Sequence, residues 1–129
     1  MVRMKCDVMN EKCPSREVLD RIADKWTALI ILALSEAGTM RYGELQRRIG
    51  GISQKMLTQT LRSLERDGLV SRTAFATVPV TVEYALTPLG ETLVPVLAAV
   101  RDWAEEHIDA VLSARGRAEH SPKRLPGIR

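Results

Sequence analysis

The stretch Gly51–Leu69, which reads GISQKMLTQTLRSLERDGL, constrains the fold more than any other part of the chain, because it holds signals for both a helix start and a helix stop. Ser53 is a favoured N-cap residue, since its hydroxyl can accept a hydrogen bond from a free N–H group of the first turn. At the other end, Gly68 can adopt the left-handed conformation that terminates many helices. The stretch therefore predicts a helix from about Gln54 to Asp67.

The two faces of this helix differ in chemistry. At about 100° per residue, the core-facing arc holds Met56, Leu57, Thr60, Leu61 and Leu64. The opposite arc holds Gln54, Lys55, Thr58, Gln59 and Arg62, with no carboxylate before Glu65. Gln and Arg can make paired hydrogen bonds to base edges, and Lys and Thr can reach bases or phosphates. An ordinary amphipathic helix fits this pattern as well, so the rest of the chain has to decide between the two interpretations.

The composition bounds the class of protein. The chain has 129 residues, of which 45% are hydrophobic, so it is long enough for one globular domain with a core. Its apolar run Ala28–Leu34 is too short to span a bilayer, and its first residues lack the apolar centre of a secretory signal. We therefore expect a cytoplasmic protein. Two cysteines, Cys6 and Cys13, are too few for a disulfide framework.

The net charge of +3 becomes informative when it is divided by region. Residues 41–82 hold seven basic and three acidic residues, whereas residues 83–113 hold one basic and six acidic residues. The basic residues of the first of these segments are Arg41, Arg47, Arg48, Lys55, Arg62, Arg66 and Arg72. Such an asymmetry is what a nucleic-acid surface on one side of a domain requires.

The first forty residues predict an arm and two helical segments. We expect a flexible arm over residues 1–12, a helix that opens at Pro14, either a restart or a continuation of that helix at Asp24, and a helix stop at Gly38. The positions expected to face the core are Val18, Leu19, Ile22, Trp26, Leu29, Ile30, Ala33 and Leu34. A short extended piece at Thr39 and Met40 follows.

The middle of the chain predicts a helix-turn-helix followed by a hairpin. A short helix over Tyr42–Ile49 is joined by Gly50-Gly51 to the helix described first, and two short helices with a glycine-containing turn are the helix-turn-helix arrangement. Beyond Gly68 the period of the pattern changes from 3.6 to 2 on both sides of Pro79, which indicates a β-hairpin. The fold predicted is mainly α with a small β-hairpin, a winged helix-turn-helix. This fold favours DNA as the partner of the polar face.

The C-terminal part predicts a long helix and a tail. Thr87-Pro88 is an N-cap followed by a first-turn proline, so we expect a helix over residues 88–113, kinked at Pro95. Its apolar stripe needs a second partner, for which another copy of the same helix is the simplest choice. The dimer contact is expected at Leu93, Leu97, Val100 and Trp103. The domain would then cover residues 13–113, with dimerisation helices at both ends, and the polar, basic residues 114–129 are expected to be disordered.

Four segments resemble one known family: CP at Cys13-Pro14, IADKW at Ile22–Trp26, RYGELQRRIGGISQKMLTQTLRSLERDGLVSR at Arg41–Arg72, and VEYALTPLG at Val82–Gly90. The family is that of the HxlR-type transcription regulators of bacteria and archaea, relatives of the MarR group. The resemblance implies a homodimer whose terminal helices pair and whose central helices enter successive major grooves of DNA. It also implies that the cysteine before the proline senses oxidants or electrophiles in some members. The family commonly carries Arg before VEY in the wing, where this chain has Thr81, so Arg72 is the remaining candidate for a wing contact.

These patterns together predict a DNA-binding regulator, expected to be a repressor, and the residues of its DNA site. Contacts from the recognition helix are expected at Ser53, Gln54, Lys55, Thr58, Gln59 and Arg62. Contacts to the DNA backbone are expected at Arg41, Tyr42, Arg47, Arg48 and Arg72, although each of these fits a solvated surface as well. Trp26 and Trp103 fit core and dimer packing better than a ligand platform. The division between base and phosphate contacts, the operator, the regulated genes, the sign of regulation and the inducer stay open.

Cys13 is a candidate redox sensor. It lies just before a helix start, between Lys12 and Arg16, which together would lower the pKa of the thiol and favour the reactive thiolate. An inert, half-buried cysteine fits the same position. Cys6 would be either a resolving thiol or a bystander.

Other classes of function receive less support from the sequence. The spacing of Cys6, Cys13, His107 and His120 fits no zinc pattern, so no metal and no cofactor is expected. No nucleophile–base pair or phosphate loop is recognisable, so no enzymatic activity is expected. Two alternatives stay open: induction by a small apolar or aromatic ligand at the dimer interface, and a winged helix that binds another protein.

Overall fold

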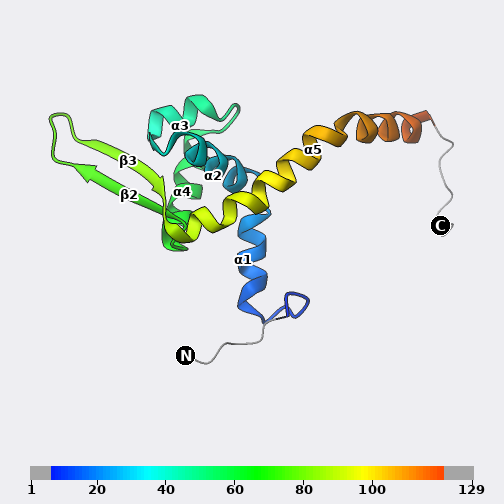
Figure 1. Ribbon diagram of the computed structural model, residues 1–129, viewed down its shortest axis with the longest axis horizontal. Coiled ribbons are helices and arrows are strands. Elements are labelled where there is room, and N and C mark those ends of the chain that lie inside the picture. Colours follow the sequence, from blue (N-terminus) through cyan, green and yellow to red (C-terminus); the bar gives the residue numbers. More distant parts are fainter. Residues whose placement is uncertain (1–6, 121–129) are drawn as a thin grey trace. The chain divides into compact units, whose positions relative to one another are not determined.

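The structure is a computed structural model that describes residues 7–120 (Figure 1). The chain forms two compact units, with the boundary between Leu97 and Ala98. The described part of the first unit holds helices α1 to α4, strands β1 to β3 and the beginning of α5. The second unit holds the rest of α5.

Helices α1 (Pro14–Ile22) and α2 (Lys25–Ala37) are separate, so the structure shows a new helix start at Asp24, one of the two alternatives left by the sequence. The Oδ1 atom of Asp24 accepts hydrogen bonds from the N–H groups of Trp26 (2.7 Å) and Thr27 (3.3 Å), which caps α2. Because α2 is apolar on nearly all sides, it supplies the centre of the core. Its buried residues are Thr27, Ile30, Ile31, Leu32, Ala33 and Leu34.

The expected inward face of α1 is wrong. No residue of α1 is buried, and Val18 and Leu19 are 54% and 49% exposed. Leu29 of α2, also expected in the core, is exposed. The core is already filled by α2 and by the helices that follow, so Val18 and Leu19 stay exposed in a single chain, whereas Ile22 is half-buried.

Helices α3 (Tyr42–Arg48) and α4 (Gln54–Arg66) form the predicted helix-turn-helix. The Oγ atom of Ser53 accepts from the N–H of Met56 at 3.1 Å, so Ser53 is the N-cap of α4. At the other end Gly68 has φ 75°, and the N–H of Leu69 donates to the carbonyl of Leu64 at 2.9 Å, which closes the helix. The stop at Gly68 is confirmed.

Strands β2 (Val70–Phe75) and β3 (Thr81–Leu86) form the predicted hairpin, with Val70 opposite Leu86 and Phe75 opposite Thr81. The sheet has a third strand, β1 (Thr39–Arg41), and the order β1-β3-β2 with all pairs antiparallel. β1 is the short extended piece expected at the end of α2. Its pairing with β3 anchors the hairpin to the helical core, because the side chain of Met40 is buried.

Helix α5 (Pro88–His120) begins against the end of α4. The Oγ1 atom of Thr87 accepts from the N–H of Gly90 at 3.0 Å and donates to the carbonyl of Gly68 at 2.5 Å. The N–H of Thr87 donates to the carbonyl of Leu69 at 3.1 Å. Gly90 packs so closely that a Cβ atom there would lie 2.1 Å from the Leu69 carbonyl oxygen. The end of α4 and the start of α5 are therefore joined by a tight backbone junction.

Two expectations about α5 are wrong. The helix continues to His120, so the disorder expected from residue 114 does not apply to Ala114–His120. Alanine, arginine and glutamate dominate this stretch and are strong helix formers. Leu97, expected between two chains, is 4% exposed in a single chain and is therefore a core residue. Pro95 lies inside α5, as expected.

The predicted arm and tail lie partly outside the described residues, which exclude residues 1–6 and 121–129. Residues 7–12 form turns, in which the N–H of Asn10 donates to the carbonyl of Asp7 at 2.9 Å. Across residues 7–120, no helix combines the length and apolar character that crossing a membrane requires.

Candidate nucleic-acid interface

The outward face of α4 is exposed as the sequence predicts. Gln54, Lys55, Gln59 and Arg62 are exposed, and Thr58 is half-buried. On the opposite side Leu57, Leu61 and Leu64 are at most 2% exposed and hold the helix on the core. Because these anchors fix the rotation of α4, its donor-rich face is held toward the outside of the unit.

Tyr42 of α3 is bound to α4. Its hydroxyl donates to the carbonyl oxygen of Gln54 at 2.8 Å and lies 2.9 Å from the Oγ1 atom of Thr58. From the sequence, Tyr42 was only a candidate for a DNA backbone contact. An aromatic residue at the first position of a short helix carries no sequence signal that it would bond to the next helix, so this role was missed.

A hollow of about 420 Å³ joins the recognition helix to the base of the wing. It is lined by Tyr42, Thr58, Leu61, Arg62, Glu65, Arg72 and Tyr84. The structure thus brings Arg72 of β2 next to Thr58 and Arg62 of α4, three residues that the sequence analysis had proposed separately. Two guanidinium groups in one hollow suit a phosphate, and Glu65, which also lines it, limits the net positive charge.

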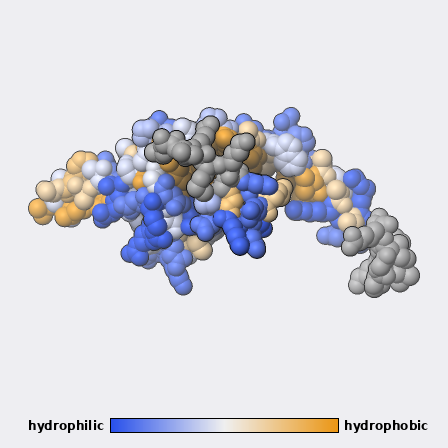
Figure 2. Space-filling model, turned by 90° about the horizontal axis from the view of Figure 1, so that it is seen from below, coloured by the Kyte–Doolittle hydropathy of each residue, from blue (hydrophilic) through white to orange (hydrophobic). Residues whose placement is uncertain are grey.

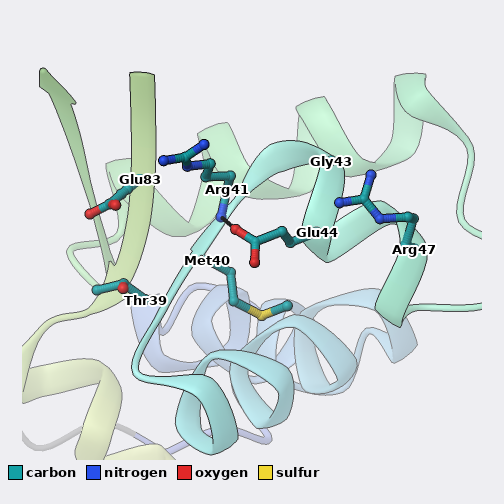
Figure 3. A pocket seen from close by; sticks show the side chains of 7 residues that line it. All are labelled: Thr39, Met40, Arg41, Gly43, Glu44, Arg47 and Glu83. Atoms are coloured by element: carbon teal, nitrogen blue, oxygen red, sulfur yellow. Dashed lines mark hydrogen bonds between the residues drawn. The ribbon is translucent and has the colours of Figure 1, made fainter. Parts of the chain in front are cut away.

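A second hollow, of about 560 Å³, lies between β1, α3 and β3 (Figure 3). Its polar lining residues include Arg41, Glu44, Arg47 and Glu83, and Glu44 lies between the two arginines in this view. The Oε1 atom of Glu44 accepts from the N–H of Arg41 at 3.0 Å, which fixes the first turn of α3. Arg41 and Arg47 therefore line the same hollow as the carboxylates of Glu44 and Glu83.

Arg48 differs from its neighbour Arg47. Its Nη2 atom lies 3.0 Å from the Oε2 atom of Glu36 on α2, in an exposed ion pair. An arginine already paired with a carboxylate is a weaker candidate for a phosphate contact, since that pair would have to be given up. Arg48 therefore ranks below the other arginines proposed from the sequence.

The opposite flank of α4 carries basic residues that the sequence analysis did not assign to the site. A hollow of about 480 Å³ is lined by Arg21, Asp24, Met56, Gln59, Thr60, Arg62, Ser63 and Arg66. Arg21 of α1 pairs with Asp67 at 3.3 Å. Arg66 was counted in the basic segment, but its position in the last turn of the helix gave no reason to place it at the site.

The tip of the wing is apolar. Phe75, Val78 and Val80 are 43%, 101% and 68% exposed. Figure 2 shows the hydrophobic colouring over this end of the β2–β3 hairpin. Residues 74–81 contain no basic side chain, so the base of the wing, at Arg72, is where it can contact a phosphate.

Cys13 is buried and occupies the N-cap position of α1. It is disulfide-bonded, and its Sγ atom lies 2.9 Å from the Oγ of Ser15. Arg16, one of the two basic neighbours, donates from Nη1 to the carbonyl of Met9 at 3.3 Å. Cys6 lies outside the described residues. Within residues 7–120, no group of three His, Cys, Asp or Glu side chains is placed to hold a metal ion.

An exposed recognition helix, a supporting helix-turn-helix and an antiparallel hairpin define a winged helix-turn-helix protein of the class that regulates transcription. The family model of the HxlR-like helix-turn-helix proteins matches residues 21–111. The chain belongs to this family.

Three similar proteins support the assignment. YtfH of Escherichia coli (strain K12), an uncharacterized HTH-type transcriptional regulator, is 50% identical over 105 residues, which are 81% of this chain and 82% of that protein. The solved structure of YtfH from Salmonella typhimurium is 45% identical, has a TM-score of 0.80, and covers 87% of this chain and 99% of its own. The redox regulator HypR in its oxidized form is 39% identical, has a TM-score of 0.67, and covers 73% of this chain and 96% of its own. The chain is thus a helix-turn-helix transcription regulator.

Proposed function

We propose that the chain is a sequence-specific repressor that binds a palindromic operator as a homodimer and reads it with the outward face of α4. The observation that carries the proposal is the exposure of Gln54, Lys55, Gln59 and Arg62 on a helix whose other side is anchored in the core. The arginine-containing hollows on either flank of α4 supply phosphate contacts. An operator occupied in this way is closed to the transcription machinery, which is the reason for proposing repression.

The homodimer is supported by apolar side chains that a single chain leaves exposed. On α5, Val100 and Trp103 are 62% and 58% exposed, and Ile108 and Leu112 continue the exposed apolar residues. Val18 and Leu19 of α1 add a second exposed apolar surface. Leu97 is excluded from this contact because it is already buried. Large apolar residues exposed in this number mark an interaction surface.

The experiment for this proposal is selection and sequencing of genomic DNA fragments bound by the purified protein, followed by footprinting. The proposal expects an inverted repeat whose half-site centres lie about 34–36 Å apart or at a multiple of that distance. Binding without any shared sequence, or to a single unrepeated site, would contradict it.

We further propose that the oxidation state of Cys13 controls operator binding. Cys13 is buried at the start of α1 and disulfide-bonded, and HypR, to which the chain is similar, is a redox regulator. Two thiols give up two electrons and two protons to an oxidant such as a peroxide when the bond forms. Because the bond constrains the start of α1, it would alter the separation of the two recognition helices and weaken binding at a fixed half-site spacing.

The redox proposal is tested by measuring operator affinity after full reduction and after mild oxidation. We expect the reduced wild type to bind more tightly than the oxidised one, and Cys13→Ser to bind equally under both conditions. Equal affinity of the wild type in both states would reject the thiol switch.

Induction by a small apolar ligand is the alternative effector mechanism. One observation favours it: a hollow of about 320 Å³ lined by Leu34, Ser35, Gly38, Leu86, Glu91, Val94 and Pro95. This hollow lies within the first unit, where α5 begins, whereas the sequence analysis placed the ligand between two chains. If oxidation has no effect on binding, this hollow becomes the first place to search for an inducer.

A further inference from the structure

The hydrogen bonds of Tyr42 fix the direction of a proton on the recognition helix. A carbonyl oxygen can only accept, so the Tyr42 hydroxyl uses its single proton on the Gln54 carbonyl, at 2.8 Å. At the 2.9 Å contact between Tyr42 and Thr58, the tyrosine oxygen must then accept and the threonine hydroxyl must donate. The hydroxyl of Tyr42 therefore has no proton left for a DNA phosphate, in contrast to the backbone contact expected from the sequence.

The consequence for Thr58 is that its only proton is directed into the protein. What Thr58 can offer to a ligand is the remaining lone pair of Oγ1 and its methyl group. Threonine in a helix has few χ1 rotamers, so a bond that holds Oγ1 on the Tyr42 side also fixes where the methyl group points. Thr58 is half-buried and lines the hollow that also holds Arg62 and Arg72, so it lies where the recognition face meets the wing.

Base edges in the major groove differ in the contacts that they can make with the lone pair and the methyl group of Thr58. Cytosine presents an amino donor, adenine an amino donor and the N7 acceptor, and thymine a methyl group and the O4 acceptor, whereas guanine presents only the two acceptors O6 and N7. A side chain limited to a lone pair and a methyl group can pair with cytosine or adenine or pack on thymine. It cannot donate to guanine O6 or N7.

We propose that Tyr42 is a positioning residue that determines specificity. Because it accepts the hydrogen bond of the Thr58 hydroxyl, it leaves Thr58 unable to donate to guanine, so Thr58 discriminates against guanine. The proposal rests on the proposed function, since it requires α4 to lie in the major groove. Tyr42 acts through Thr58 and does not itself contact a base.

The experiment is selection from a random DNA library with the full-length wild type, Tyr42→Phe, Thr58→Val and the double variant. Phenylalanine keeps the ring and removes the hydroxyl, which frees the Thr58 proton to point outward. We expect Tyr42→Phe to increase the acceptance of guanine at one position of each half-site by about 5-fold, the worth of one hydrogen bond, and to leave the other positions unchanged. In the Thr58→Val background, Tyr42→Phe should change no base preference, because no hydroxyl is left to redirect.

Thr92→Val is the control. Thr92 lies on α5, outside the proposed DNA-binding surface, and its hydroxyl donates to the carbonyl of Leu89 at 2.6 Å. Removal of this hydroxyl should leave the selected sequence unchanged. Thermal unfolding of each variant shows whether the fold is retained.

The outcomes separate the two proposals. A uniform loss of affinity for all sequences in Tyr42→Phe, an unchanged preference, or a change spread over the whole half-site would overturn the role of Tyr42. An effect of Tyr42→Phe that persists in the Thr58→Val background would overturn it too. If the wild type itself selects no sequence, the proposed function has failed instead.

Discussion

Replacing Gly90 by alanine tests the junction between the recognition helix and α5. In an open helical position this change stabilises a protein by up to about 1 kcal/mol, because glycine loses more conformational freedom on folding. At Gly90 the new Cβ would lie 2.1 Å from the carbonyl oxygen of Leu69 and 3.0 Å from its carbonyl carbon. Both atoms belong to the backbone, so no side-chain rotation can relieve the overlap.

The magnitude follows from what must move. Moving the start of α5 away from Leu69 strains the surrounding packing, which costs about 1–3 kcal/mol of stability. It also weakens the hydrogen bond from Thr87 N–H to the Leu69 carbonyl, now 3.1 Å long, which adds about 0.5–1.5 kcal/mol. After the gain in helix propensity is subtracted, Gly90→Ala should destabilise the protein by about 1–3 kcal/mol, or several degrees in Tm.

Gly116→Ala is the control for this prediction. Gly116 lies in the same helix, and, beyond its own helical turns, no atom of the described residues lies within 4 Å of the position that its Cβ would occupy. This variant should be stabilised by about 0.5–1 kcal/mol. Urea denaturation at one protein concentration compares the two, since the stability of a dimer depends on concentration. If Gly90→Ala were stabilised as much as Gly116→Ala, the close approach of α5 to Leu69 would be refuted.

Two further predictions concern the core and the dimer. Thr27 is fully buried, and its Oγ1 atom has no hydrogen-bond partner among the described residues. Thr27→Val should therefore raise the free energy of unfolding by about 1 kcal/mol. A loss of stability in denaturant titrations would show that the hydroxyl is satisfied. Trp103→Ala should weaken the dimer, so that sedimentation finds monomers at concentrations where the wild type is dimeric. Leu97→Asp should instead unfold the chain, because Leu97 is buried within it. A folded, dimeric Leu97→Asp variant would contradict the second of these predictions.

The sequence predicted the helix-turn-helix well because its signals are local. Ser53 and Gly68 have few alternatives to a cap and a stop, and the apolar residues of α4 recur with the helical period. The inward face of α1 was wrong for a reason of the same kind. Periodicity shows that Val18 and Leu19 share a face, but it does not show whether the chain itself or a second molecule covers that face.

The candidate site was predicted in part. The exposed residues of α4 follow from the turn of the helix, whereas the hydrogen bond between Tyr42 and Thr58 depends on how α3 crosses α4, which no local pattern encodes. The pairing of Arg48 with Glu36 depends on tertiary structure in the same way. Leu97 illustrates the limit for the dimer surface, because a residue on an apolar stripe can be covered by its own chain.

The most direct test of the central claim is operator affinity of the Gln59→Ala/Arg62→Ala double variant, measured by fluorescence anisotropy on the selected site. Both side chains are exposed on α4 and away from the core, so the fold should be unaffected. If each side chain pairs with a base edge, its loss costs about 1–3 kcal/mol of binding free energy, and the double variant should lose well over 10-fold in affinity. Lys25→Ala, which removes the same charge at a lysine stacked on Trp26, should bind as the wild type does. Wild-type affinity in the double variant would show that this face of α4 does not read the DNA.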